Sequence, residues 1–173
     1  MEIFLVNTDA KSNQKHSYHD VWLARGIAVA SGSLTWQRDL SRISDGDLVG
    51  IYVNKVGVVA CGIPLDDHVV EVRDQSKTVS PTEPFERHRR IDWLLDLRSA
   101  PLSISELGGL GVKINAITVR RVVSGRQHLE LRLRELLSTL IGGQNDQLRA
   151  AFLQRMTSNL GYASGPRGVG VPR

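Results

Sequence analysis

Two apolar runs joined by a short turn constrain the fold of this chain more than any other feature. Leu48–Val53 and residues 58–63 are almost entirely apolar, and the turn sequence Asn-Lys-Val-Gly lies between them at residues 54–57. Apolar runs of this length, rich in valine and isoleucine, favour strands, and a short connection that contains glycine favours a hairpin. The sequence therefore predicts two central antiparallel strands.

Four further segments have the apolar content or the alternation of strands. Residues 3–6 form a continuous apolar run that ends in a polar loop, as a buried strand does. Residues 91–95 alternate with the period of a strand that has one face inward. The other two segments are residues 69–72 and 117–123. Residues 74–84 contain two prolines and few apolar groups, so a loop is expected there.

Helical spacing marks two segments between the early strands and a third one later. The apolar positions of the two early helices are Tyr18, Val21 and Trp22, ended by Gly26, and then Trp36, Leu40 and Ile43. Ser103 and Glu106 have the spacing of a capping box, which predicts one turn of helix stopped by Gly108 and Gly109.

The character of the sequence changes after Gly125. A helical stripe runs through Leu129, Leu133, Leu136, Leu137 and Leu140, and a second helix capped by Asp146 carries Leu148, Phe152, Met156 and Leu160. We therefore expect an α+β fold: a small mixed β-barrel, closed or half-closed, of about six strands with early helices, in residues 1–124. Residues 125–160 would form a C-terminal helical appendage, and residues 161–173 a glycine-rich tail.

Composition excludes several classes of protein and is compatible with nucleic-acid binding. The 173 residues include 22 Lys+Arg and 18 Asp+Glu, for a net charge of +4, and only five of the basic residues are lysines. Arginine binds phosphate through a planar, two-pronged donor. No apolar run approaches the ~20 residues that span a bilayer, and the N-terminus lacks the pattern of a secretory signal. We expect a cytoplasmic protein without membrane partners.

The sequence is poor in signatures of catalysis. It contains no glycine-rich phosphate loop, no His-Glu-x-x-His and no Gly-x-Ser-x-Gly. The single cysteine, Cys61, excludes an internal disulfide and lies in an apolar strand, where a buried, inert thiol is expected. His16 and His19 have no accompanying set of ligands, so neither a metal nor another cofactor is predicted. These absences favour a binding protein over an enzyme.

The order of several short motifs resembles the EVE and YTH families of the PUA-like superfamily. The motifs are Phe4-Leu5-Val6-Asn7-Thr8-Asp9, then Asp20-Val21-Trp22-Leu23, then the strand pair around residues 47–63, and finally Arg89-Arg90-Ile91-Asp92-Trp93-Leu94. The resemblance covers roughly residues 2–123. It implies a PUA-like barrel that holds a modified base, such as methylated adenine or modified cytosine.

The resemblance also implies roles for individual residues. Trp22 matches the first wall of an aromatic cage, whereas its helical spacing alone predicts a position in the core. Asn7, Thr8 and Asp9 match the polar strand end that bonds the base edge. The loop that supplies a second cage tryptophan in YTH readers has no aromatic residue here, so Phe85 or Trp36 would have to replace it. The expected base-binding residues are Asn7, Thr8, Asp9, Tyr18, Trp22, Leu23, Trp36 and Phe85; Trp93 matches a packing position.

Basic residues are expected around such a pocket, where they would bind phosphate. The candidates are Arg25, Arg38, Arg87, Arg89 and Arg90, and a solvated strand end is the alternative for the last three. A second basic stretch contains Arg120, Arg121, Arg126, Arg132 and Arg134. We interpret that stretch as a helix face whose arginines pair with Glu130 and Glu135.

The sequence thus predicts a module without catalytic residues that binds a modified base in DNA or RNA, with a separately encoded nuclease or motor as a possible partner. One alternative is an ASCH-like amidohydrolase of modified nucleosides, which would need Lys11, Lys15, Lys55 or Glu71 in its pocket. Another is an adaptor that self-associates through the leucine-rich helices from Gln127 to Leu160.

Overall fold

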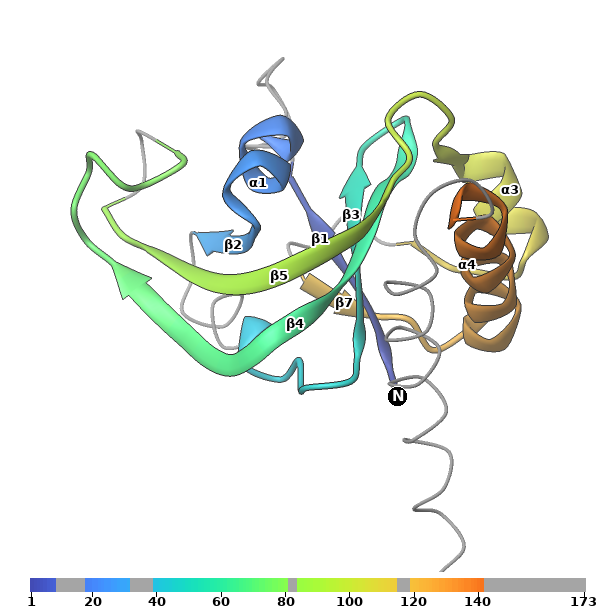
Figure 1. Ribbon diagram of the computed structural model, residues 1–173, viewed down its shortest axis with the longest axis horizontal. Coiled ribbons are helices and arrows are strands. Elements are labelled where there is room, and N and C mark those ends of the chain that lie inside the picture. Colours follow the sequence, from blue (N-terminus) through green and yellow to red (C-terminus); the bar gives the residue numbers. More distant parts are fainter. Residues whose placement is uncertain (9–17, 32–38, 81–83, 115–118, 142–173) are drawn as a thin grey trace, which may run out of the picture.

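The computed structural model describes residues 1–8, 18–31, 39–80, 84–114 and 119–141. Its elements, in chain order, are β1 (Ile3–Asn7), α1 (His19–Arg25), β2 (Ile27–Ser31), β3 (Leu48–Val53), β4 (Gly57–Val72), β5 (Glu86–Asp96), β6 (Leu102–Ser103), α3 (Ile104–Gly109), β7 (Val119–Arg121) and α4 (Arg126–Ile141). A strongly curved sheet forms the centre, with α1 at one end of β1 and with α3 and α4 together on one side (Figure 1).

The sheet is mixed and has seven strands in the order β2-β5-β4-β3-β1-β7, with β6 paired to β4. β1 is parallel to β3, and the other pairs are antiparallel. The predicted α+β class and the predicted hairpin of β3 and β4 are confirmed. In the described part of the chain the hydrogen-bonded order is open at β2 and β7, so the sheet is the half-closed form of the predicted barrel.

The number of strands differs from the predicted six for three reasons. The two segments expected at residues 58–63 and 69–72 belong to one strand, β4, which pairs with β5 on both sides of an irregularity between Pro64 and Val69. β2 and β6 were not predicted. β2 begins directly after Gly26, whose φ of 61° allows the chain to pass from helix to strand without a loop.

Two cores lie on opposite faces of this sheet, because neighbouring residues of β1 point to opposite sides. The core on the side of α3 and α4, called the α4 core, contains Ile3, Leu5, Leu48, Leu107, Leu129, Leu133 and Leu137 among others. The core on the other face, called the α1 core, contains Phe4, Val6, Trp22, Val29, Ile51 and Ile91 among others. The leucine stripe predicted after Gly125 is thus α4, buried against the sheet.

Other local predictions are confirmed where the structure describes the residues. α1 ends at Gly26, and the capping box of Ser103 and Glu106 is complete, with Ser103 N donating to Glu106 Oε2 at 2.9 Å. The helix predicted around Trp36 lies mostly outside the described residues, although Leu40 and Ile43 are buried. The helix predicted over residues 146–160 and the tail at 161–173 lie outside them too. None of the described helices is long and apolar enough to cross a membrane.

Candidate nucleic-acid interface

The polar end of β1 joins α1 to the sheet. Thr8 is buried; its N–H donates to the carbonyl of Tyr52 at 3.1 Å, and its own carbonyl accepts from the N–H of Tyr18 at 3.4 Å. Asn7 Nδ2 donates to Asn54 Oδ1 at 3.3 Å. Because Trp22 N bonds the Tyr18 carbonyl one turn later, at 3.0 Å, the helix that carries Trp22 is fixed to the strand end. The structure therefore brings Thr8, Tyr18 and Trp22 together. Asn7 lies on the opposite face of the sheet, where it lines a crevice with Leu5 and Tyr52 of the α4 core. Asp9 lies outside the described residues.

The indole of Trp22 is buried in the α1 core, with 3% of the residue exposed. This burial agrees with its helical spacing and not with an open cage wall, which is a correction to the role that the resemblance implied. Its carbonyl accepts from Trp93 Nε1 at 3.2 Å, so Trp93 has a packing role. However, the indole Nε1 of Trp22 is itself buried without a hydrogen-bond partner in the described part of the chain. An unpaired buried donor of this kind costs about 1–3 kcal/mol.

The other residues expected to contact a base do not all lie near Trp22. Tyr18 and Leu23 are half-buried and pack against the α1 core beside Trp22. Phe85 does not belong to that core; the guanidinium of Arg73 lies 5.6 Å from the centre of its ring, the distance of a cation–π contact. Trp36 lies outside the described residues. Neither residue expected to replace the second cage tryptophan is thus found in the α1 core among the described residues.

Sequence reasoning missed a residue of the loop after β4 that packs against the same core. Val79 contacts the α1 core, and its N–H donates to Glu86 Oε2 at 2.8 Å. The fully buried Glu86 carboxylate also accepts from Ser80 N at 2.6 Å and contacts His88 Nε2 at 2.7 Å. The signal in the sequence was Glu86 followed two positions later by His88, because residues two apart at the start of a strand lie on the same face and can pair.

These bonds decide the charge of Glu86. Burial by itself raises the pKa of Glu86, but hydrogen bonds from His88, Val79 and Ser80 together outweigh it, and the pKa lies below the ordinary 4.5. The carboxylate is therefore ionised and holds residues 79 and 80 against β5. Arg25 of α1 also bonds this loop, because its Nη1 donates to the carbonyl of Lys77 at 2.9 Å.

The arginines predicted to bind phosphate have partners within the protein. Arg87 lies 3.7 Å from Glu71 and Arg90 lies 3.5 Å from Asp66, both as ion pairs. Arg89 is a correction: only 1% of it is exposed, and its Nη2 donates to the carbonyl of Asp66 at 2.7 Å and to Asp67 at 3.2 Å. A buried guanidinium with these partners cannot bind a phosphate at the surface. Arg38 lies outside the described residues.

The second basic stretch contains two kinds of arginine. On α4, Arg134 pairs with Glu130 at 2.7 Å and Arg132 with Glu135 at 3.3 Å, as predicted. Arg120 and Arg121 belong to β7 instead, so the prediction that they share this helix face was wrong. They are exposed.

The thiol of Cys61 is buried between β3 and β5, and desolvation raises its pKa to about 12. It is therefore protonated and unreactive near neutral pH, as expected from its place in an apolar strand. Within the described ranges, no cluster of three or more His, Cys, Asp or Glu side chains is arranged to hold a metal.

Comparisons with known proteins identify the fold. No protein-family model matches the chain, and no curated protein matches its sequence significantly. Among solved structures, the crystal structure of human THYN1 in complex with 5-methylcytosine-containing DNA is similar, with a TM-score of 0.50 and 10% identity over 77% of this chain and 97% of that one.

Two further solved structures are similar at lower scores. One is a hypothetical protein from Leishmania major, with a TM-score of 0.46 and 14% identity over 78% of this chain and 95% of that one. The other is a protein from Pseudomonas syringae, with a TM-score of 0.43 and 15% identity over 76% and 98%. The likeness to THYN1 shows that this chain has an EVE-like fold, as the order of its motifs predicted.

Proposed function

We propose that this protein is a non-catalytic module that binds a modified base, most simply a methylated one, at the end of β1 beside Trp22. The observation that carries the proposal is the buried, unpaired indole N–H of Trp22, on a helix whose backbone is bonded to the polar strand end. A donor that lacks an acceptor in the free protein gains one when a ligand with a carbonyl or ring nitrogen arrives. The edge of a nucleobase carries both kinds of acceptor.

The physics of base reading supports this location. A methyl group adds a small apolar volume, so a protein that senses it needs rigid apolar walls together with polar groups for the base edge. Here the apolar walls would come from Leu23 and Val79, and the polar groups from the Trp22 N–H and from Thr8. In a duplex the base must first leave the stack, at a cost of a few kcal/mol, which a single strand largely avoids.

The DNA in the THYN1 crystal contains 5-methylcytosine, which makes this the first modification to test. Of the residues that the amidohydrolase alternative would need, Glu71 is ion-paired with Arg73 and Arg87. Lys11 and Lys15 lie outside the described residues. For the adaptor alternative, the leucines at 129, 133 and 137 are buried against the sheet and so do not offer a free apolar stripe.

The test is a binding panel with the full chain. Single-stranded and duplex oligonucleotides would carry cytosine, 5-methylcytosine, adenine or N6-methyladenine at one position, and fluorescence anisotropy would give the affinity at two salt concentrations. We expect tighter binding to one methylated oligonucleotide than to its plain counterpart, with the ratio unchanged by salt because the base contact is short-range. Equal affinity for every plain and modified pair would refute the proposal.

A further inference from the structure

Arg120 and Arg121 differ from the other described arginines in having no partner. Every other arginine in the described ranges makes a side-chain hydrogen bond or an ion pair within the protein. Arg120 and Arg121 are exposed, adjacent in sequence, and make neither. An exposed guanidinium group without an ion-pair partner among the described residues can bind an external anion.

These arginines lie at the walls of two hollows on either side of an edge strand. Arg121 lines an open hollow of about 450 Å³ between β7 and the start of α4, together with His128 and with Arg126, which is paired with Glu2 of the same hollow at 3.0 Å. Arg120 lines a narrow crevice with Lys113 and Asn7. β7 is the last strand of the sheet, so its outer edge is not covered by another strand in the described part of the chain.

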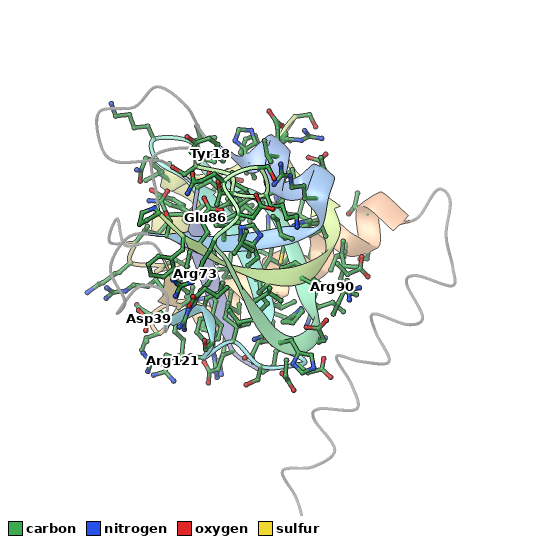
Figure 2. All side chains as sticks on the ribbon, turned by 90° about the vertical axis from the view of Figure 1, so that its left-hand side faces the viewer. Tyr18, Asp39, Arg73, Glu86, Arg90 and Arg121 are labelled. Atoms are coloured by element: carbon green, nitrogen blue, oxygen red, sulfur yellow. The ribbon has the colours of Figure 1, made fainter. Side chains whose placement is uncertain are left out.

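The register places this basic edge beside the proposed base site. Arg120 pairs with Leu5 and Arg121 with Phe4. At ~3.3 Å per residue, the distance along β1 from Arg121 to Asn7 is about 10 Å. One strand of B-DNA presents a phosphate every ~3.4 Å along its axis, so this length matches about three phosphates. The arginines of β5 lie elsewhere: Figure 2 shows Arg90 and Arg121 toward opposite sides of the molecule.

We propose that Lys113, Arg120 and Arg121, called the β7 basic edge, bind the phosphodiester backbone of the nucleic acid whose base is read beside Trp22. This inference rests on the proposed function. It assigns the phosphate contacts of the bound nucleic acid to β7 instead of β5. Arg120 and Arg121 project to opposite faces of their strand and so can contact two successive phosphates from two sides. The paired arginines on β5 would first have to leave their carboxylates, which weakens any contact with phosphate.

The experiment compares two double variants with the same change in charge. Arg120→Gln/Arg121→Gln removes the β7 pair, and Arg87→Gln/Arg90→Gln removes the β5 pair as a matched control. Anisotropy titrations of a duplex with one 5-methylcytosine, and of the plain duplex, would be repeated over a series of salt concentrations. We expect the β7 variant to lose affinity equally for both duplexes and to lower the slope of log K against log salt by about 1.8, or ~0.9 per phosphate contact.

The modified-to-plain ratio should stay unchanged in the β7 variant, and Arg120→Lys/Arg121→Lys should restore most of the slope because it keeps both charges. The β5 variant should keep the slope of the unchanged protein. An unchanged slope in the β7 variant, or an equal fall in the β5 variant, would overturn the inference. If the unchanged protein binds plain and modified duplexes equally, the proposed function fails, yet the slopes still decide the β7 assignment. No binding to any duplex would overturn both.

Discussion

At the scale of single residues, Trp22 carries a conflict between burial and hydrogen bonding. Its ring belongs to the α1 core, where it stabilises the fold, and its N–H has no acceptor there. Proteins rarely leave such groups unpaired, and those that persist often have a functional reason. The conflict is resolved if a ligand supplies the acceptor. Because Trp93 contacts Trp22 and has a bonded N–H, variants of the two tryptophans form a matched pair that tests this.

Trp22→Phe should reduce the affinity for the modified oligonucleotide by about 2–10-fold while changing stability little. The loss of one hydrogen bond accounts for the fall in affinity, and removing an unpaired donor offsets the ~1 kcal/mol cost of the smaller ring. Anisotropy and urea unfolding would measure the two effects. Trp93→Phe is the control, since it removes a satisfied donor: it should cost about 1 kcal/mol and leave the modified-to-plain ratio intact. A destabilised Trp22→Phe with unchanged binding would contradict this interpretation.

The residues also show how far the sequence could define the site. Motif order predicted that the helix of Tyr18 and Trp22 lies at the polar end of β1, and the bond from Tyr18 N to the Thr8 carbonyl confirms that position. The contact of these residues with a base stays a prediction. The arginines could not be assigned, since pairing depends on contacts between distant segments, such as that of Arg90 with Asp66. For the same reason, the burial of Arg89 had no signal in its neighbours along the chain.

At the scale of secondary-structure elements, the sequence predicted the elements that are set by turn and cap residues, and it missed those that depend on pairing with a distant strand. The hairpin, the capping box of α3 and the end of α1 at Gly26 follow from turn and cap residues within a few positions. β2 does not, because its five residues are held as a strand by their pairing with β5. β4 remains one strand across the irregularity that contains Asp66 and Asp67, because β5 pairs with it on both sides, at Pro64 and at Val69.

The loop between β4 and β5 depends on one carboxylate, so its stability should depend on pH. The pKa of Glu86 is lowered in the folded protein, so its bonds contribute fully above the unfolded pKa near ~4.3 and are lost as pH falls through the folded value. Glu86→Gln should therefore cost about 1–3 kcal/mol near pH 7, because an amide cannot accept every bond that the carboxylate accepts, and less at about pH 3. Urea unfolding at both pH values measures this.

The control for this experiment is Glu135→Gln, which removes an exposed carboxylate on α4. It should change stability little at either pH, as surface ion pairs usually do. If the cost of Glu86→Gln were the same at both pH values, ionisation of Glu86 would not be what holds the loop.

At the scale of the whole molecule, two cores share one sheet, and the chain's only cysteine lies within that sheet. Cys61 belongs to the α4 core and lies on β4, which pairs with β3 on one side and β5 on the other. Opening the protein at this point requires separating central strands, which amounts to global unfolding.

Labelling of Cys61 by an aromatic disulfide reagent should therefore follow global unfolding. In native buffer the thiol should be unreactive, because it is buried and its pKa of about 12 leaves almost no thiolate. The labelling rate should rise with urea in step with the unfolded fraction seen by circular dichroism. Rapid labelling in buffer, with an unchanged spectrum, would show that β4 opens locally.

The division into two cores also bears on how such a domain can diverge in sequence. A substitution among the leucines of α4 is absorbed on one face of the sheet, while the packing around Trp22 on the opposite face is left as it was. Mutations can thus accumulate in one layer without compensation in the other, provided that strand pairing survives. A fold shared at 10% identity, as with THYN1, therefore does not require the same core residues on either face of the sheet.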